Sequence, residues 1–573
     1  MGRKFTDKTH VGIRNEKKAD GTIYVYRNTT KYDPVTKKTR SLKQELIGKI
    51  LPNTKEIIPT RPKKKTKEKQ DEYATKQHCG INNILNWIGK ESHIDKDVEN
   101  SFELGDYQKI ISIARFMTVS SGLTLPNLKT WQITHETPYV GRITEDVYSD
   151  LFKNIGNNEG GVQRYFAHRA EKFTTPSVIA YDSTTVSTYS ENLLAARQGK
   201  SKEDNNLDII KLQTAFNILE EQPVMYIPQP GNIPDVSSVE NQLIQFEAMG
   251  LNIEFTVADN GYYSEKNLDL FLKRKVPFLI RIDNNIKWVK DIIKGVKDKI
   301  MNYNNCCPFD EEIQGTTVIV SVKNKKAIEN PNDKTVEKLY VHVFYSLNKY
   351  KTTRDSIVKQ LFILQEKIRK GEKNFSSREE KYIKDFLIFE FEENNDPAIE
   401  KQDIYNSKVK TIEFNETALE EYMELQGFFV LLSDKVSKTF EALRYYRWRE
   451  KIEDSYYIYK YYIDGRRPRN SSNESFQGKL FVQFVALGYY CFFKKKIKEL
   501  IEALELPAPA DTKKCDIILR EKLLSWLKKT SIEEIFEWFS VEQTRTIKTQ
   551  AAEYRFSTER IKRDQLFFEL LGI

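Results

Sequence analysis

Short apolar runs in the middle of the chain carry the strongest secondary-structure signal. The runs Val178–Val186 (VIAYDSTTV), Ile253–Ala258 (IEFTVA) and Phe278–Ile282 (FLIRI) are rich in β-branched and aromatic residues, which favour strands. Helices are expected to begin at Asp235 and at Ser264, between these runs. Strands that alternate with helices predict an α/β core.

The pattern changes on both sides of this core. Residues 1–70 are predicted to form a small β module with a strand at Thr22–Arg27, followed by a basic linker at Arg61–Lys69. A mostly helical region comes next, and an α+β insertion interrupts the core further on. A long helix is expected from about 438 to 461, and the C-terminal tail is predicted to be helical. The expected segments are 1–70, 71–172, 173–283, 284–425, 426–505 and 506–573.

The distribution of charge favours a nucleic-acid-binding protein, and the cysteines argue against a zinc-binding or disulfide-rich one. The net charge of +9 is modest, but basic residues gather at Arg61–Lys69, at Arg466, Arg467 and Arg469, and at Lys494–Lys498. Each cluster alone is compatible with a solvated surface, whereas three together favour a nucleic-acid partner. The five cysteines form no C-x2-C pair, which argues against a zinc site or a disulfide framework.

Targeting and cofactor signals point to a cytoplasmic protein. The start MGRKFTDKTH has no apolar core, so no signal peptide is expected. The run Leu480–Phe493 is too short to span a bilayer and predicts a buried helix, so we expect no membrane association. The chain has no G-x4-G-K-[ST] motif, and we expect no nucleotide cofactor.

Two aspartates lie in or next to predicted strands. Asp182 interrupts the run VIAYDSTTV, although strand interiors disfavour aspartate. Asp259 follows the run IEFTVA directly, where an ordinary turn aspartate is the alternative. Carboxylates that converge at strand ends are the ligands that Mg²⁺ prefers, and pairs of such ions catalyse phosphoryl transfer.

One face of the predicted long helix places an acid among bases. At about 100° per residue, Tyr446, Arg449, Glu453 and Lys460 fall within an arc of roughly 60°. An adjacent apolar stripe is expected to bury the helix, and it consists of Tyr445, Trp448, Ile452, Tyr456 and Tyr459. The alternative is a surface salt bridge from Arg449 to Glu453 with Lys460 merely solvated.

The spacing Y-x2-R-x3-E-x6-K on this helix resembles the signature of bacterial insertion-sequence DDE transposases, the insertion-sequence-four group. The segments YDSTTV, QPGNIPD, ADNGYYSEKNL and GFFVLLSD are also similar to that group, especially to its long-insertion branch. The resemblance covers residues from about 120 to 495. It implies a ribonuclease-H-like catalytic core that the α+β insertion interrupts, with the small β module, the helical region and the helical tail around it.

The resemblance also implies roles for named residues. Asp182, Asp259 and Glu453 would be catalytic and hold two Mg²⁺ ions, for which Mn²⁺ would substitute. The expected contacts to DNA are Tyr446, Arg449 and Lys460, with help from the basic residues Arg466 and Arg467. Some relatives have Trp where this chain has Phe428 and Phe429, so Phe429 either stacks on a flipped base or belongs to the strand core.

The expected partner is double-stranded DNA, namely the terminal inverted repeats of the element and the target DNA. A homodimer is expected to act on paired ends. The alternatives are a nuclease on the same fold that does not join strands and a non-catalytic DNA-binding derivative. Residues 1 to about 150 are the expected end-reading region.

A dimer interface is predicted in the tail, because the tail looks richer in apolar residues than its short helices need. The residues concerned are Trp526, Ile535, Phe536, Trp538, Phe539, Leu566, Phe567, Phe568, Leu570 and Leu571. The alternative is that the tail packs on its own core.

Overall fold

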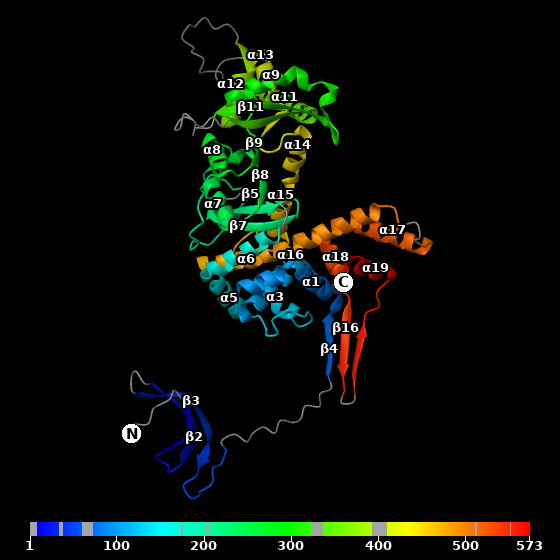
Figure 1. Ribbon diagram of the computed structural model, residues 1–573. Coiled ribbons are helices and arrows are strands. Elements are labelled where there is room, and N and C mark those ends of the chain that lie inside the picture. The colour runs from blue at the N-terminus through cyan, green and yellow to red at the C-terminus, as the bar shows by residue number, and fades with distance from the viewer. Residues whose placement is uncertain are drawn as a thin grey trace. The chain divides into compact units, whose positions relative to one another are not determined.

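The chain divides into two compact units in the computed structural model (Figure 1). The structure describes residues 9–33, 38–59, 73–173, 176–201, 206–323, 336–391, 409–509, 513–549 and 552–573. Unit 1 comprises Met1–Lys76 and Thr544–Ser557, and unit 2 comprises Gln77–Gln543 and Thr558–Ile573.

Unit 1 contains short antiparallel sheets. The strands β1 (Thr9–Lys17), β2 (Ile23–Asp33) and β3 (Lys38–Ile50) pair in the order β1-β2-β3, and the expected strand at Thr22–Arg27 is the first part of β2 apart from Thr22. A second sheet joins β4 (Tyr73–His78) to β16 (Gln543–Lys548) and β17 (Glu553–Ser557). The expected basic linker Arg61–Lys69 lies outside the described residues.

A bundle of helices forms one side of unit 2. Its members are α1 (Cys79–Glu91), α2 (Ile94–Ser101), α3 (Leu104–Val119), η1 (Leu125–Asn127), α4 (Leu128–Trp131), α5 (Glu145–Asn157), α6 (Glu159–Glu171) and α16 (Asn473–Glu505). The expected buried helix is the central part of α16, which packs against α3 and α5. An added Cβ at Gly478 would meet the Phe152 carbonyl oxygen at 1.9 Å, so this close packing requires glycine. Within the described residues, no helix is long and apolar enough to cross a membrane.

The other side of unit 2 is a nine-stranded sheet. Its order is β10-β11-β12-β15-β9-β8-β5-β6-β7, with β5, β8 and β9 parallel and the remaining pairs antiparallel. The core strands are β5 (Ser177–Thr188), β6 (Asp208–Asn217), β7 (Gln222–Pro230), β8 (Ile253–Ala258), β9 (Phe278–Ile282) and β15 (Phe428–Ser433). The elements between them are η2 (Asp235–Ser237), α7 (Val239–Ala248), η3 (Asn260–Tyr262) and α8 (Glu265–Arg274).

Residues 284–425 contribute both to this sheet and to a separate small core. The strands β10 (Cys306–Cys307), β11 (Asp310–Lys323) and β12 (Val336–Ser346) extend the sheet beyond β15, next to α9 (Lys287–Ile300) and η4 (Tyr303–Asn305). The small core is built from α11 (Leu347–Arg369), α12 (Ser377–Phe386), β13 (Leu387–Phe391), β14 (Val409–Phe414) and α13 (Glu416–Met423).

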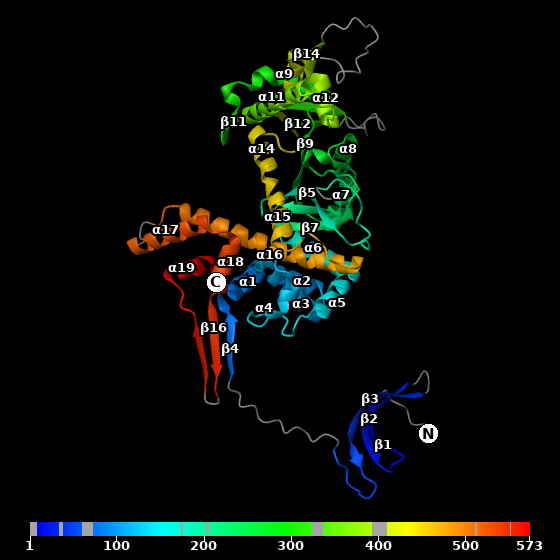
Figure 2. The same ribbon diagram turned by 180° about the vertical axis from the view of Figure 1, so that it is seen from behind.

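The expected long helix is present as two helices in line. Helix α14 (Thr439–Trp448) packs against β8 and β11, and α15 (Glu450–Tyr461) packs against β5 and α16 (Figures 1 and 2). Ile452, Tyr456 and Tyr459 of the predicted apolar stripe are buried, while Tyr445 and Trp448 are partly buried.

The tail differs from the prediction in two respects. It is not wholly helical, because β16 and β17 accompany α17 (Lys514–Lys529), α18 (Ile532–Ser540) and α19 (Lys562–Leu571). Its apolar surplus is also smaller than predicted: Ile535, Phe536, Phe539, Phe567 and Phe568 are at most 3% exposed, whereas Trp538 and Leu570 are exposed. Phe539 and Phe567 stack with ring centroids 5.0 Å apart, so the tail buries these residues within its own unit.

Candidate active site

Asp182 lies in the middle of the fully buried strand β5, between β8 and β6. Its carboxylate accepts a hydrogen bond from the Ser183 N–H at 2.8 Å and one from the Arg449 guanidinium at 3.3 Å. The Tyr456 hydroxyl donates to the Asp182 carbonyl at 2.6 Å, which ties the strand to helix α15. The unusual strand aspartate therefore faces the helix that carries the acid-and-base pattern.

Asp259 follows β8, the parallel neighbour of β5. Its carboxylate caps η3 through the Asn260 N–H at 2.8 Å and accepts from the Tyr446 hydroxyl at 2.9 Å. The Arg281 guanidinium lies 3.9 Å away on β9. Burial and the nearby Asp259 raise the pKa of Tyr446 to about 12, so the phenol stays protonated and donates this hydrogen bond.

Arg449 stands at the centre of the site, at the junction of α14 and α15. One guanidinium nitrogen lies 3.3 Å from Asp182 and the other lies 2.8 Å from Glu453. Burial opposes the charge of Arg449, but Tyr446, Asp182, Asp259 and Glu453 together raise its pKa. The predicted i, i+4 ion pair is present, but its arginine side chain is only 11% exposed and it also binds a second carboxylate. The pair is thus part of a larger acidic site.

The arrangement gathers three carboxylates around one cation. Asp182, Asp259 and Glu453 are all oxygen donors of the kind that Mg²⁺ and Mn²⁺ prefer, and all three act on the charge of Arg449. Their chemistry therefore fits divalent ions. Among the described residues, no group of three or more His, Cys, Asp or Glu side chains lies close enough to hold one ion. Asp182 and Glu453 contact Arg449, whereas Asp259 contacts Tyr446 and Arg281.

The predicted DNA contacts lie on the same helix and just beyond it. Lys460 is in the last turn of α15. The Arg466 guanidinium lies 5.6 Å from the Tyr461 ring, and Arg467 lies 5.3 Å from the ring of the exposed Tyr189, to whose hydroxyl it donates at 3.0 Å. Tyr189 follows β5, so this basic segment reaches the strand that carries Asp182.

The two aromatic residues of β15 have different surroundings. Phe428 is buried against Tyr345, whereas Phe429 is partly buried and stacks on Phe344 with ring centroids 4.9 Å apart. The Lys349 ammonium lies 5.9 Å from the centre of the Phe429 ring.

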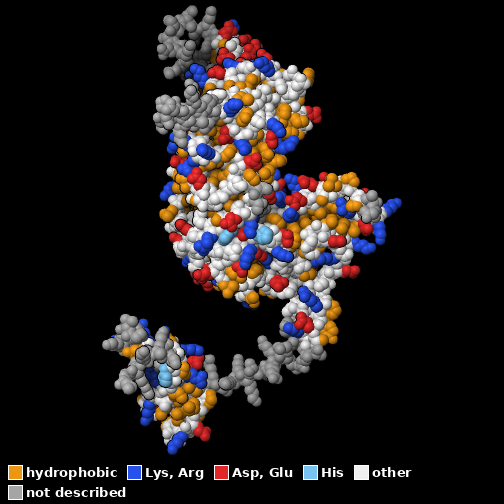
Figure 3. Space-filling view, viewed as in Figure 1, with side chains coloured by type: hydrophobic (Ala, Val, Ile, Leu, Met, Phe, Trp, Pro, Cys, Tyr) orange, Lys and Arg blue, Asp and Glu red, His pale blue; other side chains and the backbone are white. Residues whose placement is uncertain are grey.

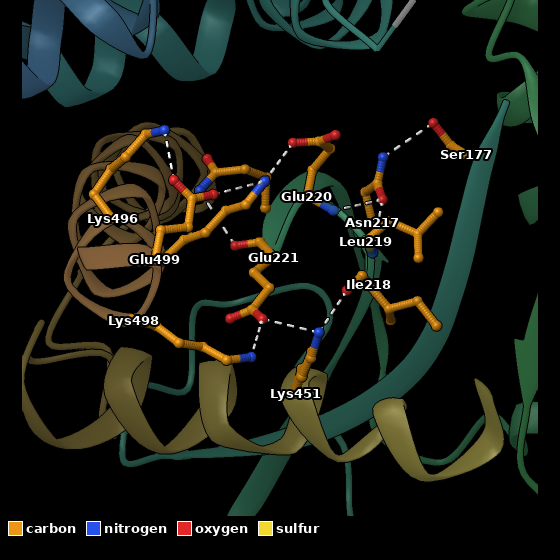
Figure 4. Close-up of polar contacts among 12 residues, drawn as sticks. Ser177, Asn217, Ile218, Leu219, Glu220, Glu221, Lys451, Lys496, Lys498 and Glu499 are labelled. Carbon is orange, nitrogen blue, oxygen red and sulfur yellow. Dashed lines mark hydrogen bonds and ion pairs between the residues drawn. The ribbon is translucent and has the colours of Figure 1, made fainter. Parts of the chain in front are cut away.

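A second charged cluster holds the opposite face of α15. Glu221, in the turn between β6 and β7, accepts from Lys451 of α15 at 2.9 Å and from Lys498 of α16 at 3.0 Å (Figure 4). Lys451 also donates to the Ile218 carbonyl at 2.9 Å. These partners were not foreseen from the sequence, because the residues concerned are far apart along the chain.

The basic cluster Lys494–Lys498 proves to be paired with acids. Lys494 bonds to Asp454 at 3.2 Å, Lys495 to Glu220 at 2.6 Å and Lys496 to Glu499 at 2.7 Å. On the face of unit 2 seen in Figure 3, Lys and Arg side chains are interspersed with Asp and Glu. This cluster therefore supports the packing of α16, and it is weaker evidence for a nucleic-acid partner than its spacing indicated.

The parallel strands, their flanking helices and the acidic site define a mixed α/β protein with a ribonuclease-H-like core. The family described as Transposase DDE domain matches residues 173–487, which is more than half of the chain. The chain belongs to this family, and the predicted insertion-sequence-four type is confirmed.

Membership makes the protein a DNA-binding DDE transposase, an enzyme of DNA cleavage and strand transfer, and enzymes of this type generally use divalent metal ions. No curated protein matches the chain. Among solved structures, the chain is similar to a piggyBac transposase in a synaptic complex with hairpin DNA, at 8% identity and a TM-score of 0.34. That similarity covers 79% of this chain and 84% of the other, and it is too weak to support further argument.

Proposed function

We propose that this protein cleaves DNA at the ends of its own insertion sequence and joins the 3′-hydroxyl ends to target DNA. Asp182, Asp259 and Glu453 are the catalytic carboxylates. The observation that carries the proposal is their common partner: residues from β5, from the end of β8 and from α15 all act on the charge of Arg449.

Two Mg²⁺ ions, or Mn²⁺ in their place, would be held by these three carboxylates and would supply charge stabilisation at the scissile phosphate. The positive charge of Arg449 is balanced by the three acids. Its Nε is buried and has no hydrogen-bond partner among the described residues. A bound phosphate would give this guanidinium an anionic partner close to the reacting bond.

The remaining residues of the helix, and those just beyond it, orient the substrate. Tyr446 fixes the Asp259 carboxylate by its hydrogen bond. Lys460, Arg466 and Arg467 provide positive charge for the DNA strand that leads away from the active site. Such contacts fix the position of the DNA backbone and carry no sequence information. We therefore assign the reading of the ends to residues 1 to about 150, outside the catalytic core.

We further propose that the protein belongs to the long-insertion branch, that the inserted segment is 284–425, and that two copies act together on paired ends. A two-fold assembly would coordinate cutting at both ends of the element. Five of the ten apolar residues that suggested an interface in the tail are buried within its own unit, whereas Trp538 and Leu570 are exposed, so the tail interface stays a prediction with a smaller apolar surface.

The decisive experiment supplies the protein with a duplex that carries the terminal repeat flanking its gene, a supercoiled target and Mg²⁺. We expect cleavage at the repeat end and a joined product. Glu453→Gln should lose both, whereas the matched variant Glu450→Gln, an exposed acid one turn away on the same helix, should retain both.

Cleavage without any joined product would favour the nuclease alternative. Specific binding with no cleavage by the intact chain would favour the non-catalytic one.

A further inference from the structure

A small cavity opens beside Asp259, on the side of the active site that faces the inserted segment. Its volume is about 170 Å³, several times the roughly 30 Å³ that one water molecule takes in the liquid. The residues that matter to its chemistry are Asn260, Arg281, Asp283, Asn285, Lys349 and Gln426. The cavity therefore joins the metal-binding end of the sheet to the first turn of α11.

Two cations, Arg281 and Lys349, line this cavity. Arg281, on β9, is 3.9 Å from Asp259. Lys349 is solvent-accessible and lies over the Phe429 ring, and it makes no ion pair with any residue that the structure describes. Partial burial of the ammonium lowers the pKa of Lys349, and the positive charge of Arg281 lowers it further. An anion bound between the two side chains would stabilise both positive charges.

One acid, Asp283, also lines the cavity. Asp283 is exposed, and its carboxylate accepts a hydrogen bond from the Asn285 backbone N–H at 2.9 Å. The loop that holds both residues is fixed to β15, because the Asn284 side chain donates to the Phe428 carbonyl at 2.8 Å. Amide side chains, one carboxylate and two cations thus line the cavity, and a hydrogen bond to β15 holds the loop that carries the carboxylate.

The location relative to the catalytic carboxylates indicates which anion fits. Neighbouring strands lie about 4.8 Å apart, and β9, β8 and β5 are adjacent in that order. Arg281 therefore lies about one strand spacing beyond Asp259, on the side away from Asp182. Lys460 and Arg467 belong to the other flank, since Arg467 contacts Tyr189 beyond the end of β5.

We propose that Arg281 and Lys349 form a second phosphate-binding pocket, which holds the DNA backbone on the insertion side of the scissile phosphate. This inference rests on the proposed function, because it takes the scissile phosphate to lie at Asp182, Asp259 and Glu453. The inserted segment thereby acquires a direct part in catalysis: it carries Lys349 and sets it against the end of β9.

The test measures binding of a terminal-repeat duplex in buffer without divalent ions, so that the DNA stays intact. A series of duplexes carries one neutral methylphosphonate each, at successive positions on both sides of the cleavage point. For the wild-type protein, one position on the insertion flank should weaken binding roughly tenfold, as expected for one charge-assisted hydrogen bond.

Lys349→Gln should bind the unmodified duplex roughly tenfold more weakly and should be insensitive to that same methylphosphonate. Lys349→Arg should restore the sensitivity. The matched control is Lys351→Gln, an exposed lysine in the same turn of α11, which should behave as the wild type. Arg281→Gln, checked for an unchanged unfolding temperature, should lose sensitivity to the same phosphate.

Equal sensitivity to every methylphosphonate in the wild type and in Lys349→Gln would overturn the pocket, while Mg²⁺-dependent cleavage by the wild type would leave the proposed function standing. If the wild-type protein neither binds nor cleaves the repeat duplex, the proposed function fails and the pocket fails with it.

Discussion

The two faces of helix α15 carry charged clusters that differ in sign: acids outnumber bases on one face, and bases outnumber acids on the other. At about 100° per residue, Lys451 points roughly 160° away from Glu453. On the Glu453 face, three carboxylates act on the single buried guanidinium of Arg449. On the Lys451 face, the single carboxylate of Glu221 lies between two lysines (Figure 4).

Accessibility separates these clusters more clearly than charge does. The Glu453 side chain is 52% exposed and that of Asp259 is 33% exposed, so the acidic cluster is open to ions and to DNA. In the other cluster, the Lys498 side chain is 55% exposed, but Glu221 is 14% and Lys451 is 22% exposed, and each of these two is held from two sides. We infer that the first cluster serves chemistry and that the second fixes the helix on which that chemistry depends.

The largest effect is expected from the acidic cluster. Asp182→Asn should reduce cleavage of the repeat duplex by at least about a thousandfold, because the charge stabilisation lost amounts to several kcal/mol. Binding to the same duplex should persist, which a gel-shift titration measures beside the cleavage assay. Near-normal cleavage in Mg²⁺ would mean that Asp182 is not a catalytic carboxylate.

The buried, uncharged His342, near the start of the catalytic helix, should make the free energy of unfolding depend on pH. His342, buried in β12, is hydrogen-bonded to the Thr317 hydroxyl at 2.7 Å and to the Val436 carbonyl at 3.0 Å. The Thr317 hydroxyl lies 2.6 Å from that of Thr439, the first residue of α14. Burial lowers the pKa of His342 to about 4, although the bond to Val436 raises it in part.

Because this folded-state pKa lies below the unfolded value of about 6.5, the unfolded chain binds the proton first as the pH falls. The contribution of His342 is complete above pH 6.5 and is lost on acidification towards pH 4. The free energy of unfolding should decrease by about 3 kcal/mol over that range. Thermal unfolding of His342→Gln should depend less on pH, and equal pH profiles would contradict the assignment.

The second charged cluster is expected to affect stability before activity. Glu221→Gln leaves the partly buried Lys451 and the exposed Lys498 without their carboxylate and should cost about 1–3 kcal/mol, or several degrees in Tm. Glu220→Gln is the matched control, because Glu220 is 43% exposed and pairs with Lys495 alone. A Tm shift no larger for Glu221→Gln than for Glu220→Gln would remove the distinction between the two faces of the helix.

The smallest expected effect is on the salt dependence of DNA binding, which should differ between the basic cluster at Arg466–Arg469 and the one at Lys494–Lys498. Arg467→Gln should lower the salt slope of DNA binding by about one, as expected for one lost phosphate contact. Lys494→Gln should leave the slope unchanged, because Lys494 is paired with Asp454. Identical slopes for these variants would show that both clusters are equally remote from DNA.

The sequence by itself determined the features that depend on local geometry. Helical periodicity puts Tyr446, Arg449 and Glu453 on one face, and the alternation of short apolar runs with helices predicts an α/β core, in which β5, β8 and β9 prove to be parallel. The resemblance also follows from ordered local motifs, and the match over residues 173–487 confirms the DDE transposase family.

Tertiary structure decided every feature that depends on residues far apart in the chain. The lysines Lys494, Lys495 and Lys498 look alike in sequence, yet acids from distant turns and helices pair with them. The strands β16 and β17 join β4 across most of the chain length, and the tail buries Phe536, Phe539, Phe567 and Phe568 within its own unit. Lys349 and Arg281 likewise come together only because β12, β15 and β9 pair in one sheet. The physical reason is that charge pairing and burial depend on distance in space, whereas periodicity describes only the faces of a single element.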